Sequence, residues 1–507
     1  MTRLEIVPFA CCLAILLAAS ALAGVYDVTG SGAVGDGKTN DTAAIQAAID
    51  ACGKAGGGTV CVPAGDYLSG GLVLRSGVTL RLEAGATIRS SRNPDDFPHG
   101  GSLLAARDAE RIAIVGGGTL RGIGDADLGR RAAARDHDKE RWPSFRAGIL
   151  RLEDCRDVTL RDFRILLSDT WTVHLYRCDN VLIDGLTIRN NYFRTNSDGI
   201  DPVSCKNVRI TGCHIVAGDD CIVVKTRDGE PCENVVVDNC TLESIATAIK
   251  LGTESSGDFR NVHFANCSIR NSTVGIGMYL KDGGTMERIT FANIDIENYA
   301  PQGITTVEHS MFPIFVDVER RDADSPVGRI RDLFFSGIQI TSGAGVLIQG
   351  MPESAIENLT LRDVTFRVAG PLDYADRRKH IGGRRTTHDE RDTLYVRQPA
   401  YVTTAHVDGL TLDNLRVVSS AEDFAAFPRA AFSGHEMRHF AIHNVLRKPP
   451  GGKEAFPVIL LDNCRDGLVT GQIPSEGVPA RVKLSGEKSA NVAVPGNPGF
   501  SSVEKDH

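Results

Sequence analysis

The sequence predicts an all-β protein, a single-domain right-handed parallel β-helix (solenoid) that begins with a short N-terminal capping helix. Three rows of residues recur along the chain with nearly the same period. One row is spaced by 23, 27 and 27 residues and the other two by 27 and 27: Cys155, Cys178, Cys205 and Cys232; Cys213, Cys240 and Cys267; and Ile222, Ile249 and Ile276. Self-similarity at this period, in segments rich in β-forming residues, indicates a solenoid of stacked strands.

Residues 1–23 have the features of a secretory signal peptide. Arg3 provides positive charge, an apolar run extends from Phe9 to Ala19, and Ala21-Leu22-Ala23 is a small-residue cleavage site. No later segment approaches the roughly 18 consecutive apolar residues that are typical of a membrane-spanning helix. We therefore expect a secreted protein, extracellular or periplasmic, in which residues 24–497 form one β-helix domain and residues 498–507 form a disordered tail.

A short helix is predicted directly after Asp41. Asp41 is a suitable N-cap, and the alanine- and isoleucine-rich residues 42–49 have helical periodicity. A helix here would cover the open end of a solenoid, which otherwise exposes its core. The glycines at positions 56–58 do not indicate a phosphate-binding loop, because no Gly-Lys-Ser/Thr follows them.

Short β-rich runs follow one another from Gly58 almost to the end of the chain. Glycine, proline or charged residues separate them, which is typical of strands joined by turns. The clearest runs are residues 59–62, 71–74, 78–82, 111–115, 158–160, 181–183, 208–210, 235–237, 407–412 and 457–462. Charged segments without strand character interrupt the pattern at 125–141 and 373–398. The second, rich in arginine, is interpreted either as a solvated excursion or as a rim that attracts a polyanion.

Of the 13 cysteines, Cys11 and Cys12 belong to the signal peptide. The two cysteine rows are interpreted as buried ladders of small apolar side chains. Cys52 and Cys61 are the pair expected to form a disulfide, because export permits it and the loop between them is short. A zinc site is not expected, because no Cys-x-x-Cys spacing is present. The net charge of −8 argues against nucleic acid as a partner.

The chemically distinctive stretch is Asn196-Ser197-Asp198-Gly199-Ile200-Asp201, followed by Gly218-Asp219-Asp220. Asp198 and Asp220 are 22 residues apart, close to the length of one coil. Residues one coil apart lie side by side in parallel strands, about 4.8 Å apart, so the carboxylates of Asp198, Asp219 and Asp220 are expected on one face. Carboxyl groups that face one another across a sugar can cleave a glycosidic bond. Each aspartate taken alone is better explained by turn chemistry, because Asp-Gly and Gly-Asp pairs are common in turns.

These motifs, together with Asp169-Thr170-Trp171-Thr172-Val173-His174, resemble glycoside hydrolase family 28, which contains polygalacturonases and rhamnogalacturonan hydrolases. The resemblance runs from about Val28 to Asn298 and is strongest between Arg146 and Thr226. It implies that Asp219 is the general acid and that Asp198 and Asp220 hold and activate water. It also implies direct, inverting water attack, for which carboxyl groups about 6.5–9.5 Å apart are expected.

The sequence departs from the family at the residues that hold the substrate carboxylate there. Counting 27 residues on from Asp220 reaches Thr247, where the family has a histidine. Lys250 is interpreted as an ordinary solvent-facing strand residue, with a compensating cation as the alternative. Tyr279-Leu280-Lys281 is the best match to the family's Arg-Ile-Lys, and it keeps the lysine but not the arginine. The expected substrate-binding set is Asn196, Asp201, Thr247, Lys250, Tyr279 and Lys281.

We therefore expect a monomeric hydrolase without metal or cofactor that acts on a pectic, uronate-containing polysaccharide of galacturonan or rhamnogalacturonan type. The partial loss of carboxylate-holding residues predicts that a terminal or branched linkage is cut faster than polygalacturonic acid. A calcium-dependent polysaccharide lyase on the same fold is one alternative, since carboxylates ligate Ca²⁺. The Asp-Asp pair without a calcium-loop pattern favours the hydrolase. A non-catalytic carbohydrate-binding β-helix is the other alternative, and the presence of all three aspartates argues against it.

Overall fold

The computed structural model describes residues 24–124, 145–298, 312–369, 394–395, 398–420, 422, 429–448, 457–471 and 482–495. The predicted signal peptide, the predicted tail, and most of the charged segments 125–141 and 373–398 lie outside these residues. Within the described part of the chain, no helix is both long enough and apolar enough to cross a membrane.

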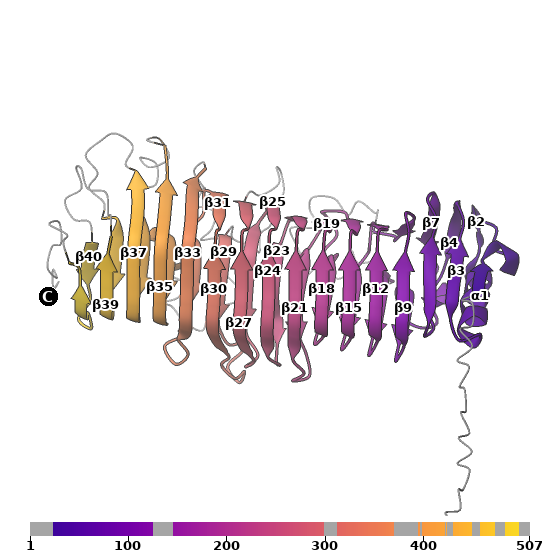
Figure 1. Ribbon diagram of the computed structural model, residues 1–507, viewed down its shortest axis with the longest axis horizontal. Coiled ribbons are helices and arrows are strands. Elements are labelled where there is room, and N and C mark those ends of the chain that lie inside the picture. Colours follow the sequence, from indigo (N-terminus) through magenta and orange to yellow (C-terminus); the bar gives the residue numbers. More distant parts are fainter. Residues whose placement is uncertain are drawn as a thin grey trace, which may run out of the picture.

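The chain forms an elongated stack of parallel strands with one helix at its N-terminal end (Figure 1). The helix α1 (Thr42–Lys54) packs on the first strands through buried Ile45, Ile49 and Cys52, so it covers the end of the stack as predicted. Asp41 stands at its N-cap position. Its carboxylate accepts hydrogen bonds from the backbone N–H groups of Val34 (2.7 Å) and Gly35 (3.1 Å) instead of from the helix.

The strands belong to two sheets, one of 27 strands (sheet A) and one of 14 strands (sheet B). Sheet B consists of β5 (Leu72–Val73), β8 (Ser102–Arg107), β11 (Gly148–Glu153), β14 (Val173–Tyr176), β17 (Ile200–Val203), β20 (Ile222–Thr226), β23 (Thr247–Ser255), β26 (Val274–Leu280), β29 (Phe312–Val318), β32 (Val346–Gln349), β34 (Ala400–Ala405), β36 (Ala430–His435), β38 (Ile459–Asp462) and β40 (Val482–Ser485).

Sheet A wraps the other faces of the same coils. It consists of β1 (Gly24–Asp27), β2 (Asp36–Asn40), β3 (Gly58–Val62), β4 (Gly65–Ser69), β6 (Val78–Leu82), β7 (Ala86–Ser90), β9 (Glu110–Val115), β10 (Thr119–Arg121), β12 (Arg156–Arg161), β13 (Arg164–Leu166), β15 (Asp179–Asp184), β16 (Thr187–Arg189), β18 (Lys206–Thr211), β19 (His214–Ala217), β21 (Cys232–Asp238), β22 (Thr241–Ser244), β24 (Phe259–Ala265), β25 (Ser268–Ser272), β27 (Thr285–Ala292), β28 (Asp295–Asn298), β30 (Arg329–Ser336), β31 (Gln339–Ser342), β33 (Ile356–Val368), β35 (Val407–Val418), β37 (Arg438–Lys448), β39 (Arg465–Thr470) and β41 (Ala490–Ala493). Two short 3-10 helices, η1 (Thr29–Ser31) and η2 (Pro94–Asp96), lie in the first coils.

The number of strands in each coil changes along the stack. In the middle of the chain, each coil gives sheet A two separate strands, such as β18 and β19. Toward the C-terminus these two strands become one, because the 13-residue strand β33 pairs with both β30 and β31.

Asparagines in the left-handed conformation align the turns between successive coils. Asn180, Asn207, Asn234 and Asn261 enter sheet A with φ of 56°, 54°, 57° and 55°. The side-chain amide of Asn234 donates to Asn207 (3.0 Å), and that of Asn261 donates to Asn234 (2.9 Å). Asparagine adopts this backbone conformation more readily than most residues. The same turn is therefore repeated at intervals of one coil, which keeps the strands in register.

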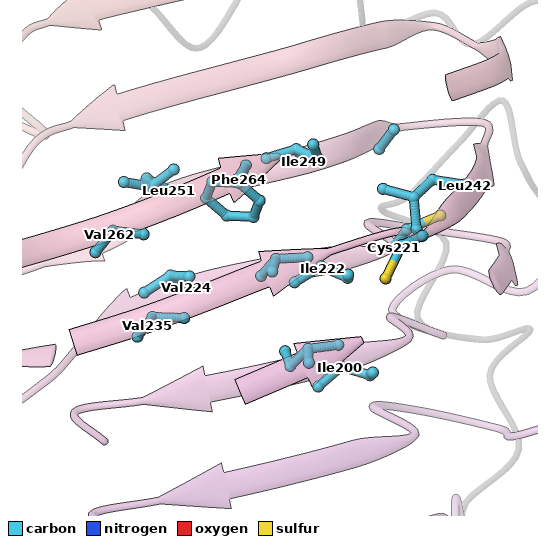
Figure 2. Packing of buried hydrophobic residues seen from close by; sticks show 14 of the residues in the cluster. Ile200, Cys221, Ile222, Val224, Val235, Leu242, Ile249, Leu251, Val262 and Phe264 are labelled. Atoms are coloured by element: carbon cyan, nitrogen blue, oxygen red, sulfur yellow. The ribbon is translucent and has the colours of Figure 1, made fainter. Parts of the chain in front are cut away.

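The interior of the stack is a continuous apolar core in which equivalent residues lie above one another. Ile222, Ile249 and Ile276 are paired in register across β20, β23 and β26, as their spacing predicted. Figure 2 shows Ile200, Ile222 and Ile249 of sheet B in one buried cluster with Val235, Leu242, Val262 and Phe264 of sheet A. Both cysteine rows are buried and unbridged, which confirms that they are core ladders.

The predicted disulfide between Cys52 and Cys61 is wrong, because both thiols are free. Cys52 is buried under α1, whereas Cys61 is only partly buried between two fully buried valines of β3. Successive side chains of a strand point to opposite faces. Cys61 therefore points away from the core into which Cys52 is packed.

Candidate active site

The aspartates of the motif converge because β17 and β20 are paired in the predicted register. Ile200 is the partner of Ile222, so Asp198 and Asp220, each two residues earlier, enter the sheet side by side. One carboxylate oxygen from each of Asp198, Asp219 and Asp220 lies within 4.8 Å of the other two. The predicted convergence is confirmed. These oxygens are closer together than the separation of about 6.5–9.5 Å expected between carboxyl groups, because two of the aspartates are consecutive and the third precedes the adjacent strand.

The two glycines in the turns before these strands cannot be replaced by larger residues without a steric clash. A Cβ at Gly218 would lie 2.2 Å from the carbonyl oxygen of Asn191, and one at Gly199 would lie 2.4 Å from that of Cys221. The buried hydroxyl of Ser197 donates to the carbonyl of Arg194 (2.6 Å) and accepts from the backbone N–H of Gly218 (3.2 Å). Turn chemistry and site chemistry therefore operate together, since tightly packed turns place the carboxylates.

Asp219 is held by the backbone. Its carboxylate accepts hydrogen bonds from the backbone N–H groups of Asn196 (2.9 Å) and Asp220 (3.0 Å). Burial, and then the charge of Asp220, raise the pKa of Asp219 to about 6. Among the described residues, no ammonium or guanidinium group forms an ion pair with it. Asn196, predicted to bind substrate, is exposed and contacts the site through its backbone N–H.

Asp198 and Asp201 share a buried lysine that the sequence analysis missed. Lys225 Nζ lies 2.7 Å from Asp201 Oδ1 and 3.5 Å from Asp198 Oδ2. Burial, and then the charges of Asp201 and Asp219, raise the pKa of Asp198 well above its usual range, whereas Lys225 lowers it. Burial raises the pKa of Asp201 to about 6 against the opposing charge of Lys225. Asp201 therefore completes the charge network of the site.

An aromatic ring covers the same lysine. Lys225 Nζ lies 3.5 Å from the centroid of the Trp171 ring, a distance at which a cation–π interaction is strong. The sequence contained a signal for both residues, because Trp171 lies within the family motif and Lys225 lies two residues after the outward-facing Val223 of β20.

Lys250 is a member of the site. Its Nζ lies 2.6 Å from Asp220 Oδ2, and only 15% of its side chain is exposed, so its interpretation as a solvent-facing residue is wrong. Lys250 faces outward on β23. Every residue of the neighbouring strands β20 and β26 is buried, so an outward-facing residue here is not exposed to solvent. Burial lowers the pKa of Lys250, but the charges of Asp220 and Asp219 outweigh this effect and raise it overall. Thr247 reaches Asp220 through its backbone N–H (3.2 Å to Oδ1).

Two further predicted residues lie one coil beyond. Tyr279 is paired in register with Gly252 of β23, and the centroid of its ring lies 5.5 Å from Lys250 Nζ. Lys281 forms a buried ion pair with Glu319, a partner that the sequence did not indicate. The structure therefore brings together Asp198, Asp201, Asp219, Asp220, Thr247 and Lys250 with Tyr279 beside them, whereas Lys281 is already matched by a carboxylate.

A second charge network lies on the N-terminal side. Buried Asp169 forms an ion pair with Arg194, and Arg146 Nε approaches it at 3.8 Å. The guanidinium of Arg146 also donates to the carbonyl of Thr195 (2.6 Å). This network fixes residues 194–195, which precede Asp198 in the chain.

The three clustered oxygens are close enough together to be compared with a site for a hard cation. The chemistry of the donor set argues against this use. Lys225 and Lys250 already direct ammonium groups at Asp198 and Asp220, so a divalent cation would lie beside two positive charges. We assign no metal to this site.

The fold and the site define the class of the protein: a parallel β-helix with carboxyl groups that converge on one sheet. The family model described as "Glycosyl hydrolases family 28" matches residues 52–376, well over half of the chain. The chain belongs to this family, and the match extends beyond the end of the predicted resemblance near Asn298.

Curated relatives of the chain are polygalacturonases. One from Vitis vinifera, named "Probable polygalacturonase", is 33% identical over 213 residues, which cover 38% of this chain and 43% of the relative. An exopolygalacturonase from Zea mays is 28% identical over 211 residues (41% and 50%), and an endo-polygalacturonase from Pectobacterium carotovorum is 28% identical over 210 residues (37% and 52%). The chain thus spans about half the length of the curated relatives it matches.

Solved structures support the fold. An exopolygalacturonase from Thermotoga maritima superposes with a TM-score of 0.60 at 24% identity, covering 68% of this chain and 87% of that chain. A family 28 exopolygalacturonase from Yersinia enterocolitica gives a TM-score of 0.53 at 18% identity, covering 95% and 78%. At these identities the likeness establishes the β-helix architecture.

Proposed function

We propose that the protein hydrolyses glycosidic bonds in a pectic polysaccharide, with Asp219 as general acid and Asp198 and Asp220 as the groups that hold and deprotonate water. The observation that carries the proposal is the unequal distribution of cations among converging carboxyl groups. Lys225 contacts Asp198 and Lys250 contacts Asp220, whereas Asp219 forms no ion pair in the described part of the chain. Lys250 and Lys225 lower the pKa of Asp219 without forming an ion pair with it, and burial and Asp220 outweigh them. This balance suits Asp219 to keep a proton.

The reaction follows from this distribution. Asp219 donates its proton to the glycosidic oxygen as the bond from that oxygen to the anomeric carbon breaks. Water attacks the anomeric carbon and gives its proton to the carboxylate pair. No donor among the described residues contacts the buried Oδ1 of Asp198, which suits an oxygen that accepts a hydrogen bond from the attacking water. Proton transfer of this kind contributes roughly 10²–10⁴-fold.

The substrate class is proposed from the relatives, all named above as polygalacturonases. The decisive test is the release of reducing sugar from a panel of pectic polysaccharides and aryl glycosides by the wild-type protein and by Asp219→Asn. Asp324→Asn, at an exposed position, is the matched control. Release from one class of pectic substrate that is lost only in Asp219→Asn would support the proposal. No release from any substrate would refute it.

Inversion is the proposed stereochemical course. An ion-paired carboxylate is a weak nucleophile toward carbon, but two of them side by side can orient one water. The short spacing of the oxygens, within 4.8 Å, is closer to that of retaining enzymes and makes the experiment informative. Proton NMR of the first-formed product should show the anomer opposite to that of the substrate. A retained anomer or a trapped glycosyl-enzyme would assign a nucleophile to this cluster instead.

Hydrolysis is distinguished from lyase chemistry by two measurements on the same preparation. Activity should be unchanged by EDTA, because the proposed steps use only side chains and water. The products should lack the ultraviolet absorbance of an unsaturated uronide. Calcium dependence together with that absorbance would identify a lyase.

A further inference from the structure

We propose that Lys225 is a positioning residue of the active site, whose ammonium group favours the ionised form of Asp198 and so weakens its competition with Asp219 for the proton of the carboxyl cluster. This inference rests on the proposed hydrolase function, and it gives a task to a residue outside the predicted catalytic and substrate-binding sets. Lys225 projects from β20 between two acidic side chains, 2.7 Å from Asp201 and 3.5 Å from Asp198.

Such a cation is needed because the surroundings of Asp198 favour its neutral form. The carboxyl is buried, and the carboxylates of Asp201, Asp219 and Asp220 surround it. A buried carboxyl near like charges holds its proton unless an opposite charge lies close by. Lys225 is the cation in contact with Asp198 among the described residues. Lys225 lowers the pKa of Asp198, which burial and Asp201 nevertheless raise well above its usual range. Without Lys225, Asp198 would hold its proton to a still higher pH and compete more strongly with Asp219.

The lysine is itself held in place. The Trp171 ring, from the segment before β14, lies 3.5 Å from Nζ and shields it from water, while 7% of the Lys225 side chain is exposed. Burial lowers the pKa of Lys225, but Asp201 and then Asp198 raise it more, so the group stays charged across the working range. The titratable and charged groups that act on this lysine or its two partners are Asp198, Asp201, Asp219, Asp220, Lys250, Arg146, His174 and Arg227.

Three of these groups do not replace Lys225. Burial lowers the pKa of His174 to about 3, so the imidazole is neutral where the enzyme works. Arg227 is engaged by both carboxylate oxygens of Glu254 at 2.8 Å. Lys250 is engaged by Asp220. Arg146 interacts electrostatically with Asp198, but Lys225 is the cation in ion-pair contact with it among the described residues, and a single substitution removes that contact.

The test uses Lys225→Met, which removes the charge but keeps most of the volume, and Lys225→Arg, which keeps the charge. The acidic limb of the kcat/KM profile, which reports ionisation of the base, should move up by about 1 to 3 pH units in Lys225→Met. It should stay near its wild-type position in Lys225→Arg. Lys206→Met, on the exposed face of β18, is the control and should leave the profile unchanged.

A merely structural lysine predicts a different pattern. In that case Lys225→Met, with its packing preserved, would keep the wild-type limb, and this result would overturn the proposal. If Lys225→Met does not fold, as judged by circular dichroism, Trp171→Leu provides the second test. It retains the lysine but removes the ring, and it should shift the same limb upward by a smaller amount. An unchanged limb in Trp171→Leu would then overturn the proposal.

A readout independent of activity separates this inference from the proposed function. In protein labelled with ¹³C at aspartate carboxyl carbons, the titration of Asp198 should move to higher pH in Lys225→Met by at least about one unit. If the wild-type protein cleaves nothing but Asp198 shifts, the proposed function fails while the role of Lys225 stands. If the protein is active and Asp198 does not shift, the inference about Lys225 is wrong.

Discussion

The outer faces of the two sheets differ sharply on the same coils, although both sheets cover one core. On sheet A, β18 begins with exposed Lys206 and Asn207 and then alternates, with Arg209 exposed between buried Val208 and Ile210. On sheet B, every residue of β17 and β20 is buried, including Asp201 and Lys225. Inward-facing side chains thus serve the fold in both sheets, whereas outward-facing ones are solvated in one and form a charged, enclosed site in the other.

The difference extends to ion pairs. Arg260 and Glu233 on sheet A are 2.5 Å apart, with 37% and 24% of their side chains exposed. Lys225 and Asp201 on sheet B are 2.7 Å apart, with 7% and 0% exposed. Exposed pairs contribute about 0–1 kcal/mol to the free energy of unfolding, because water solvates either partner alone. Buried charges depend on their partners, so the site is a network in which each group determines the state of the next.

The largest expected effect is the loss of the acid. Asp219→Asn preserves size and can keep one of the two backbone hydrogen bonds that the carboxylate accepts, but it removes the transferable proton. We therefore expect kcat to fall by roughly 10²–10⁴-fold while the fold persists. Asp324→Asn, outside the network, should retain full activity. A kcat for Asp219→Asn above about one tenth of the wild-type value would remove Asp219 from the role of acid.

The second prediction compares the two ion pairs directly. Asp201→Ala leaves the Lys225 ammonium buried without its nearest partner, and we expect the free energy of unfolding to fall by about 3–5 kcal/mol. Glu233→Ala on sheet A should lower it by about 0–1 kcal/mol. Urea unfolding of both variants at pH 7 measures the difference. Equal losses would mean that the sheet B network tolerates an unmatched charge, contrary to the contrast drawn above.

The third prediction concerns pH. The folded-state pKa values of Asp201 and Asp219, both about 6, lie above the value of about 3.9 for an unfolded aspartate. The folded protein therefore binds more protons between these values, and the stability that these groups contribute at low pH is lost as pH rises from about 4 to about 6. Other titratable groups also change the free energy of unfolding with pH, so the wild-type protein must be compared with a variant that lacks one of these carboxyl groups.

This contribution, on the order of 1–3 kcal/mol, should be smaller in Asp219→Asn. Urea unfolding at pH 4.5 and 6.5 of the wild-type protein and this variant checks it. The rate should show the matching limb, because kcat falls as Asp219 loses its proton above about pH 6. Identical pH dependence of stability in the two proteins would show that Asp219 titrates normally.

The repeat in the sequence predicted most of the fold, because residues that stack on one another must be small or apolar and must recur once per coil. The 22-residue interval from Asp198 to Asp220 and the 27-residue interval to Thr247 were correct for the same reason. Periodicity predicts which residues are neighbours, but it does not predict how much of an outward-facing side chain is exposed to solvent. Lys250 was therefore misjudged, and Lys225 was missed.

Contacts between individual side chains also could not be predicted from the sequence. Glu319 is 38 positions after Lys281, and no repeat connects them. Cys52 and Cys61 looked like a disulfide because they are near in sequence, but strand alternation turns one thiol away from the other. Opposite charges and thiols find partners through space, and only the folded coil defines which side chains share a face.

The smallest expected effect concerns substrate preference, which depends on outward-facing residues of sheet B alone. A charge-assisted contact to a uronate contributes about 1.5–3 kcal/mol, roughly 10- to 150-fold in affinity. Tyr279 supplies no positive charge on its coil, and Lys281 is matched by Glu319. We therefore expect kcat/KM on a rhamnogalacturonan or substituted galacturonan to exceed that on polygalacturonic acid by about tenfold, which corresponds to roughly 1.4 kcal/mol.

Lys281→Ala should leave this ratio unchanged, since its ammonium group is already neutralised. A preference for polygalacturonic acid of about tenfold or more would mean that another cation, with Lys250 beside Asp220 as the first to test, holds the uronate in this protein.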